Sequence, residues 1–128
     1  MREILFRAKR TDNGEWCEGY LSKSRDENKH LKLCIDHEEQ GVMCSSIVIP
    51  ETVEQYTGLT DKNGKKIFEG DIVRLDGTEI SQIRYCEGVY RLCNEDGYYG
   101  VSVHNHHSYV EVIGNIHDNP ELLKGGAE

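Results

Sequence analysis

The sequence lacks the features that would assign the protein to a membrane or to the secreted space. No run of ~18 apolar residues is present, so no membrane-spanning helix is expected. The opening residues, MREILFRAKR, carry charges around a short apolar patch and lack the long apolar region of a signal peptide. The five cysteines are odd in number and none forms a Cys-x-x-Cys pair, which favours free thiols in a reducing compartment. A cytoplasmic protein is therefore predicted.

Basic residues are in the minority. The chain has 23 acidic and 15 basic residues and a formal net charge of -8. Because binding to a phosphate backbone relies on clustered Lys and Arg, this balance predicts no binding to nucleic acid. The acidic residues are interspersed with Lys and Arg, which is typical of a solvated surface and not of a protein that imitates DNA.

Helical spacing of apolar residues is also absent, and the sequence consists instead of short alternating segments between turns. In the segment HLKLCID, for example, Leu31, Leu33 and Ile35 fall on one face of an extended strand. The chain has 13 glycines but only two prolines. Turn signals recur at intervals of about 8–12 residues. These features predict an all-β fold, a small partly open barrel or sandwich of short antiparallel strands.

One short helix is predicted near the C-terminus, with Asn119 as its N-cap and Pro120 at its first position. We expect a single β-rich domain over residues 1–123, with two small lobes joined near residue 50 as the alternative. Residues 124–128 are expected to form a disordered tail.

The stretch that looks most like a motif runs from Gln55 to Val73 and has Asp-x-Asn-Gly at its centre. It does not fit a calcium loop, because Lys65 would occupy a ligand position if Asp61 were the first ligand. It does not fit a phosphate-binding loop, because its glycines are too widely spaced and no helix follows. We interpret it as a hairpin whose Lys and Asp side chains keep the tip soluble.

Three turns carry most of the local structural signal. The two Asn-Gly pairs supply the positive φ angles of type I′ hairpin turns. A second sharp bend follows at Gly70, and Asp71 is interpreted as a carboxylate that caps this bend, with an acid or a metal ligand as the alternative. The predicted structural turn residues are Asn13, Gly14, Asn63, Gly64, Gly70 and Asp71.

Three segments of the chain resemble the YopX-like family of bacteriophage and prophage proteins. They are MREILFRA at the start, IPETVEQYTGLTDKNGKKIFEGDIVRL in the middle and YVEVIGNIHDNPELL near the end. Lys9 departs from the Trp that often follows FRA in that family. The resemblance implies a small β-rich phage accessory protein in the cytoplasm of a bacterial host. It assigns no catalytic residue, because no activity is settled for the family.

The second half of the chain combines tyrosine with arginine around the short turn Cys86-Glu87-Gly88. In a hairpin, an Arg and a Tyr from this region are expected to project from the same face. Such a cluster suits recognition of a planar or anionic small molecule, or of a partner protein. Partly buried strand tyrosines are the alternative explanation. The predicted binding residues are Arg84, Tyr85, Tyr90, Arg91 and Tyr98.

The segment VSVHNHHSYV holds three histidines. On a strand, His104 and His106 would share a face and offer two imidazoles to one metal ion, while His107 would point away. A third ligand is required, for example His30, His117 or a carboxylate from a neighbouring strand. A polar outer face or a loop tip explains these histidines without a metal.

Motifs of common catalytic sites are absent, and no cofactor is predicted. This absence counts against catalysis more than against binding. The first expectation is a non-enzymatic binding module for a host or phage protein. We also expect it to form a homo-oligomer, since small β proteins must manage their edge strands. The alternatives are a protein that sequesters a small anionic, nucleotide-like ligand, and a metal-dependent enzyme that uses His104 and His106.

Overall fold

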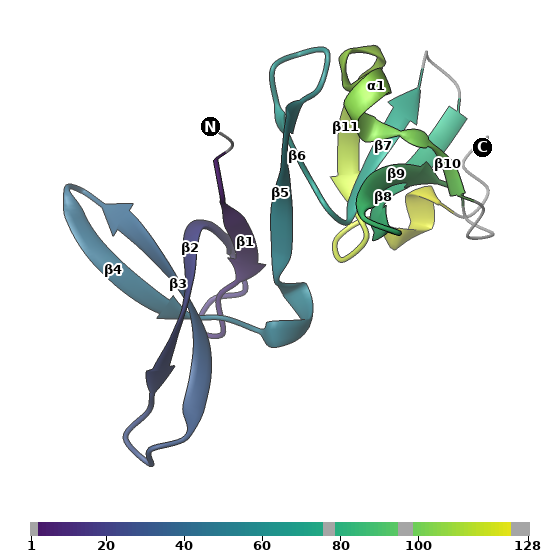
Figure 1. Cartoon of the computed structure of the whole chain (residues 1–128). Coiled ribbons are helices and arrows are strands. Elements are labelled where there is room, and N and C mark those ends of the chain that lie inside the picture. The colour runs from purple at the N-terminus through teal and green to yellow at the C-terminus, as the bar shows by residue number, and fades with distance from the viewer. Residues whose placement is uncertain (1–2, 76–78, 95–98, 124–128) are drawn as a thin grey trace. The chain divides into compact units, whose positions relative to one another are not determined.

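The computed structural model describes residues 3–75, 79–94 and 99–123. The chain divides into two compact units, Met1–Tyr56 and Thr57–Glu128. Strands predominate, and they form two antiparallel sheets that are not closed into a barrel (Figure 1). The prediction of an all-β fold of short antiparallel strands is therefore confirmed. Within the described ranges, no helix has the length and apolar character needed to cross a membrane.

The first unit is a meander of antiparallel strands. Its elements are β1 (Phe6–Lys9), β2 (Trp16–Arg25), β3 (Leu31–Glu39), β4 (Val42–Ile47), the 3-10 turn η1 (Pro50–Thr52) and the start of β5 (Glu54–Thr60). The strands lie in the order β4-β3-β2-β1-β5, and β5 continues into the second unit, where it pairs with β6 (Lys66–Phe68). A bridge between Arg10 and Val48 joins the chain after β1 to the chain after β4.

The core of the first unit is small. Ala8, Ile35 and Val48 are buried there, and Phe6, Cys17, Leu33 and Val53 pack against them. Strand β2 approaches β3 closely at Gly19, where an added Cβ would lie 2.0 Å from the carbonyl oxygen of Asp36. Only glycine allows the two backbones to lie this close together. The core occupies the part of the sheet nearest β1.

The second unit contains a five-stranded sheet in the order β10-β9-β8-β7-β11. Its further elements are β7 (Asp71–Leu75), β8 (Glu79–Cys86), β9 (Val89–Cys93), β10 (Tyr99–Ser102), α1 (Val103–His106), η2 (His107–Tyr109), β11 (Val110–Asn115) and η3 (Pro120–Leu122). The core of this unit is formed by Ile67, Val73, Ile83, Leu92, Val103 and Val110. Alternation along β7, β8 and β9 directs these side chains to one face of the sheet.

The short helix near the C-terminus is η3, a single 3-10 turn that begins at Pro120 after Asn119, as predicted. The Asn119 side chain does not cap it. Instead, Asn119 Oδ1 accepts the backbone N–H of Asn115 at 3.2 Å, so the side chain holds the end of β11. The predicted tail at 124–128 lies outside the described residues. All five cysteines are free.

The hairpin turns differ from the predicted types. Asn13 and Asn63 do not have positive φ angles; Gly14 and Gly64 alone do, at 72° and 82°. Gly64 N–H donates to the Asp61 carbonyl and Asp61 N–H donates to the Lys65 carbonyl, which makes a type I turn followed by a left-handed glycine. The type I′ prediction for the two Asn-Gly pairs is wrong, because only the glycine takes a positive φ angle.

Type I′ turns occur at two other places. Gln40 and Gly41 have φ angles of 51° and 83°, and Glu87 and Gly88 have φ angles of 54° and 82°. Both pairs connect strands through a two-residue loop, between Glu39 and Val42 and between Cys86 and Val89. This loop length selects the type I′ turn even where the first residue is not Asn.

The turn at Asp61 recurs in the first unit between β2 and β3. There, Asp26 N–H donates to the His30 carbonyl and Lys29 N–H donates to the Asp26 carbonyl. In both turns the Asp Oδ1 accepts two further backbone N–H groups, two and four residues along the chain. Lys29, with a φ angle of 68°, occupies the position that Gly64 has in the second turn. The carboxylate, and not the glycine, is the shared feature.

These two turns give a paired prediction on stability. Gly64→Val should lower the free energy of unfolding by about 1–3 kcal/mol, because a β-branched residue is strained at a positive φ angle. An added Cβ at Gly64 meets nothing within 4 Å, so the loss comes from the backbone and not from a clash. Lys29→Gly should raise stability, since it relieves the same strain. Urea unfolding followed by circular dichroism measures both, and a loss of stability in Lys29→Gly would contradict this explanation.

Candidate functional site

Asp61 is a buried carboxylate, although the sequence suggested that it would keep the hairpin tip soluble. Its side chain is 5% exposed. Oδ1 accepts the N–H groups of Asn63 and Lys65, both at 2.9 Å, and Oδ2 accepts the N–H of Val112, also at 2.9 Å. Burial raises the pKa of Asp61, but these three N–H groups and the Lys65 ammonium outweigh burial and hold the pKa below its ordinary value. Asp61 therefore fixes the turn to β11.

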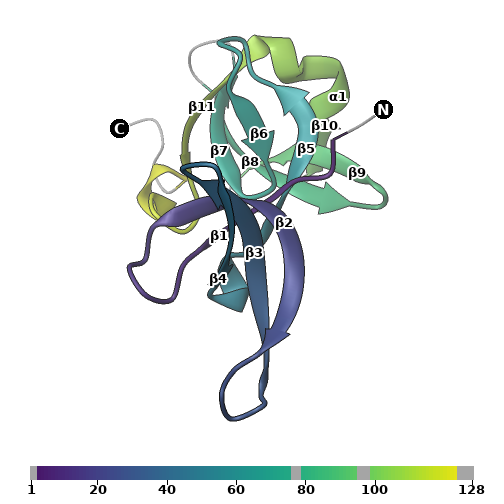
Figure 2. The same cartoon turned by 90° about the vertical axis from the view of Figure 1, so that its left-hand side faces the viewer.

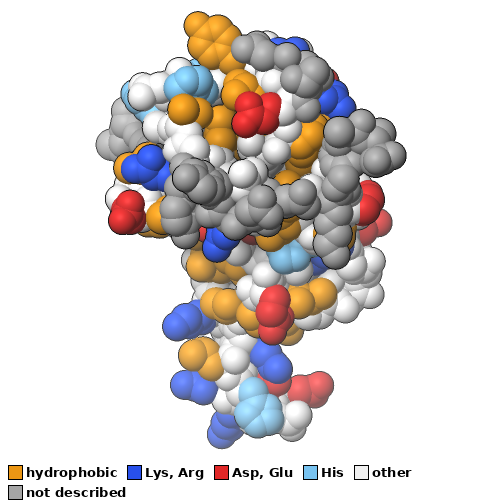
Figure 3. Space-filling model, turned by 90° about the vertical axis from the view of Figure 1, so that its right-hand side faces the viewer, with side chains coloured by type: hydrophobic (Ala, Val, Ile, Leu, Met, Phe, Trp, Pro, Cys, Tyr) orange, Lys and Arg blue, Asp and Glu red, His pale blue; other side chains and the backbone are white. Residues whose placement is uncertain are grey.

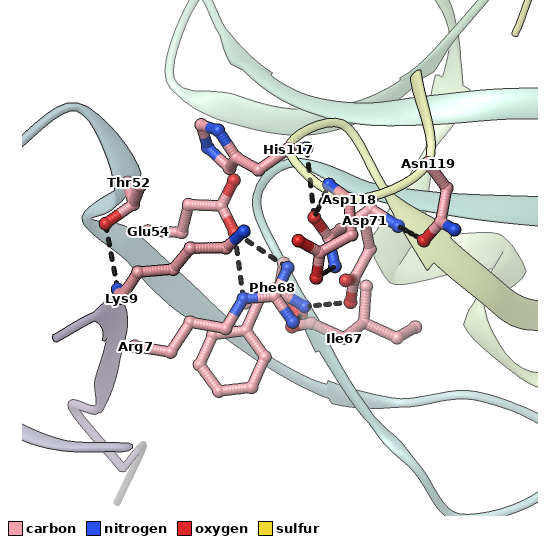
Figure 4. Close-up of polar contacts among 12 residues, drawn as sticks. Arg7, Lys9, Thr52, Glu54, Ile67, Phe68, Asp71, His117, Asp118 and Asn119 are labelled. Atoms are coloured by element: carbon pink, nitrogen blue, oxygen red, sulfur yellow. Dashed lines mark hydrogen bonds and ion pairs between the residues drawn. The ribbon is translucent and has the colours of Figure 1, made fainter. Parts of the chain in front are cut away.

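The bend at Gly70 holds a second buried carboxylate. Gly70 has a φ angle of 90°, and its N–H donates to the Ile83 carbonyl at 2.8 Å. Asp71 is 1% exposed, and its Oδ2 accepts the backbone N–H of Phe68 at 2.8 Å (Figure 4). This contact spans the bend between β6 and β7. The geometry around Asp71 is that of a side chain that stabilises a turn.

A buried ion pair joins β1 and β5 in the first unit. Arg7 and Glu54 are directly opposite in the register of the two strands. Arg7 Nη2 lies 2.7 Å from Glu54 Oε1, and Arg7 Nε donates to the same oxygen at 2.8 Å (Figure 4). The two side chains are only 12% and 5% exposed. No sequence pattern indicated this pair, because 47 positions separate the two residues.

The histidine segment does not form the strand on which the metal hypothesis depended. Strand β10 ends at Ser102, and His104 and His106 lie on the one-turn helix α1. Two residues apart on a helix are about 200° apart around its axis, so the two imidazoles do not share a face. His106 Nδ1 lies 3.2 Å from the Ser102 carbonyl, and His107 Nδ1 lies 2.8 Å from the Thr60 carbonyl. No group of three His, Cys, Asp or Glu side chains within the described residues is placed to hold a metal ion.

The predicted Arg–Tyr cluster is divided between two faces of the β8–β9 hairpin. Arg84 lies opposite Arg91 and Tyr85 lies opposite Tyr90, so each face carries one pair of like residues. The tyrosine rings meet edge to face, with centroids 4.9 Å apart, and Tyr90 packs against the core. The expectation that an Arg and a Tyr project from one face is therefore wrong. Tyr98 lies outside the described residues.

The second unit has a cavity of about 220 Å³ on the core side of this sheet. It is lined by Leu75, Glu79, Ser81, Leu92, Asn94, Gly100 and Val101. Pockets for drug-sized ligands usually measure about 300–1,000 Å³. The cavity is therefore small for a nucleotide, and Arg84 and Arg91 are not among its lining residues.

Most of the exposed large hydrophobic side chains among the described residues lie on the first unit. We call residues 20–25, 31–39 and 42–47 the β2–β3–β4 arm. Figures 1 and 2 both show its β2–β3 hairpin projecting away from β1. Of the ten large hydrophobic side chains that are exposed among the described residues, six lie on this arm. They are Tyr20, Leu21, Leu31, Val42, Met43 and Ile47.

One face of the arm combines apolar side chains with fixed negative charge. The register places Tyr20, Asp36 and Ser45 side by side on three neighbouring strands, with Met43 and Ile47 on the same face. Tyr20 is 59% exposed and Met43 is 63% exposed. The arm thus presents apolar surface to solvent around a carboxylate. Figure 3, seen from the right-hand side of Figure 1, shows hydrophobic side chains that reach the surface between charged side chains of both signs.

Hydrogen bonds stabilise the ionised form of this carboxylate. Asp36 Oδ1 accepts the hydroxyl groups of Ser45 and of Ser22, the latter at 2.8 Å. The hydrogen bonds from Ser45 and then Ser22 lower the pKa of Asp36 below its ordinary value. Strand β4 is the edge strand of this sheet, and its sequence VMCSSI contains no charge and no proline. Natural edge strands use such residues to block pairing with other chains, and β4 lacks them.

Comparisons with known proteins place the chain in a family. The family model described as YopX protein matches residues 5–124, nearly the whole sequence. The chain belongs to the YopX family. The resemblance seen in three segments of the sequence therefore extends through the segments between them. No curated protein matches the sequence significantly.

Solved structures agree with this assignment. The YopX-family chain is 27% identical to protein EF1440 from Enterococcus faecalis, with a TM-score of 0.59, over 97% of this chain and 100% of that one. It is 20% identical to protein yopX from Bacillus subtilis, with a TM-score of 0.57, over 97% of this chain and 100% of that one. The second likeness shows a shared fold and carries no functional argument. The family assignment names no activity, so function must be argued from the surface.

Proposed function

We propose that this YopX-family protein is a non-enzymatic binding module, and that the β2–β3–β4 arm binds another protein. The observation that carries the proposal is the exposed face of Tyr20, Met43 and Ile47 around the ionised Asp36. Exposed apolar patches rimmed by polar groups mark interaction sites. Strand β4 adds an uncharged edge to which an extended segment of a partner can pair.

The partner is a host or phage protein that contributes an extended apolar segment bearing Lys or Arg. Charge complementarity supports this choice, because Asp36 and Glu38 lie on the apolar face and the chain carries a net charge of -8. A second copy of this chain would bring the same acidic face to the contact. Self-association through β4 is therefore the competing outcome, to be recognised by native mass spectrometry.

Substitutions on the arm test this function against a matched control. Met43→Glu should reduce affinity for the partner by at least about tenfold, because it places a charge in the apolar contact. Asp36→Asn should weaken binding less, since it removes one charge and keeps the shape. Val101→Glu, which changes a 43% exposed apolar strand residue in the second unit, should leave binding unchanged.

The measurement begins with capture from bacterial cells by the tagged protein and continues with the purified partner in calorimetry. Capture alone does not support the proposal; loss of the reconstituted complex in Met43→Glu does. Equal affinity of Met43→Glu and the parent protein would overturn the assignment of the arm. A dimer of the parent that Met43→Glu converts to a monomer would replace the foreign partner with a second copy.

A further inference from the structure

The two arginines that the structure separates from the tyrosines form a pair of their own. Arg84 on β8 and Arg91 on β9 are directly opposite in the register, so their side chains leave the same face of the hairpin. Arg84 is exposed and Arg91 is half-buried. We propose that this pair binds a phosphate group, either free or carried by a small molecule. The site lies in the second unit and does not depend on the function proposed for the arm.

The pair is unsatisfied within the part of the chain that the structure describes. No carboxylate there forms an ion pair with Arg84 or Arg91, although like charges directly opposite on a sheet repel. Arg91 Nε is buried without a hydrogen-bond acceptor. Arg91 Nη1 reaches the Gly100 carbonyl only at 3.4 Å, a long contact. A buried donor without an acceptor is costly, and a bound anion would remove the repulsion between the two guanidinium groups.

The charges of both arginines also affect one neighbouring thiol. Burial raises the pKa of the neighbouring Cys93 thiol, while the charges of both Arg84 and Arg91 lower it. Cys93 pairs with Gln82 in the register, which places it on the same face as the two arginines. Both guanidinium groups are therefore near enough to one position on this face to stabilise a negative charge there.

The chemistry of the pair favours phosphate over a single carboxylate. A guanidinium group offers a planar fork of N–H donors that matches the oxygens of phosphate. Near neutral pH a phosphate monoester carries close to two negative charges, which balance two arginines. Tyr85 and Tyr90 lie on the opposite face, so neither of their rings stacks on the ligand. The pair should therefore recognise the phosphate and be indifferent to an attached base.

The test is a titration of the full chain with inorganic phosphate at constant ionic strength, followed through the Nε–Hε signals of arginine by NMR. The signals of Arg84 and Arg91 should shift and saturate. Adenosine monophosphate should give the same response and adenosine none. A response to adenosine monophosphate without one to inorganic phosphate would show that the pair does not recognise phosphate by itself, and would overturn the proposal.

Two variants that each remove one positive charge from the same face of the sheet distinguish a specific phosphate site from non-specific attraction by positive charge. Arg84→Gln should weaken phosphate binding by at least about tenfold, the factor expected for losing a charged hydrogen-bonding partner. Arg74→Gln removes the same charge from the neighbouring strand β7, where Arg74 lies 3.6 Å from Glu111, and should leave binding unchanged. Equal weakening by both variants, or a phosphate response that does not saturate, would show non-specific electrostatic attraction in place of a binding site and would overturn the proposal.

The melting temperature gives a second test. If Arg84 only stabilised the fold, Arg84→Gln would melt at a lower temperature than the parent, whereas loss of repulsion between the arginines would not lower it. Without phosphate, Arg84→Gln should melt at the same or a higher temperature than the parent, because it relieves repulsion from Arg91. Added phosphate should raise the melting temperature of the parent and of Arg74→Gln, but not that of Arg84→Gln. A lower melting temperature of Arg84→Gln in the absence of phosphate would assign Arg84 a structural role and contradict the proposal.

Discussion

Glu54→Leu is expected to lower the free energy of unfolding by about 3–5 kcal/mol, the loss typical of a broken buried ion pair. The substitution leaves Arg7 charged at a position where its side chain is 12% exposed. The guanidinium also lies over the Trp16 ring, with 4.9 Å between its central carbon and the ring centroid. Arg7 therefore cannot turn to solvent without losing a second contact. Urea unfolding followed by circular dichroism measures the loss.

The chain supplies its own control for this prediction. Arg74 and Glu111 are also directly opposite on antiparallel strands, but at 3.6 Å and with side chains 41% and 38% exposed. Glu111→Leu should therefore cost no more than about 1 kcal/mol. The double variant Arg7→Met/Glu54→Leu should recover part of the stability that Glu54→Leu loses, because it removes both charges of the pair. If Glu54→Leu and Glu111→Leu lower the free energy of unfolding equally, burial does not determine how much the Arg7–Glu54 pair contributes to stability.

Asp61→Ala is expected to lower the free energy of unfolding by about 2–4 kcal/mol, since it leaves three backbone N–H groups without their acceptor. Asp61→Asn should cost less, because the amide oxygen can still accept from Asn63 and Lys65. Its NH2 group then faces the N–H of Val112, so the contact to β11 is lost. The two variants together separate the turn from its attachment to β11.

The contribution of Asp61 also depends on pH. Its pKa in the folded chain is below the unfolded value of about 3.9, so the unfolded chain binds the proton first as the pH falls. The stability that the carboxylate provides is thus complete above the unfolded pKa and is lost as the pH falls through the folded pKa. The difference in stability between the parent and Asp61→Asn should shrink in acid. If the stability difference between the parent and Asp61→Asn stays constant until the protein unfolds in acid, the charge of Asp61 has no role in stability.

The strands were predictable because alternation is a local property. Leu31, Leu33 and Ile35 share a face of β3 as expected, because the pattern is set by neighbouring residues alone. Alternation failed at Val103, where the pattern VSVH continues but the chain turns into α1. The side chain of Val103 is buried in the core, and this tertiary contact outweighs the local preference.

The candidate sites were less predictable, because they depend on register and on distant partners. A loop of two residues between Cys86 and Val89 puts Arg84 opposite Arg91; one residue more would have changed which side chains share a face. The burial of Asp61 depends on Val112, which is 51 positions away. The apolar face of the arm arises because β2, β3 and β4 extend beyond the small core, and no local pattern reports where a core ends.

Site-specific photocrosslinking in bacterial cells tests the binding function most directly. A benzophenone amino acid replaces Met43 on the edge strand in one variant and Asn63, at the exposed tip of the Asp61 turn, in a control. We expect position 43 to form a crosslinked adduct with one protein other than this chain, Asp36→Asn to weaken that adduct, and position 63 to form none. No adduct from position 43, or the same adduct from both positions, would contradict the proposed binding function.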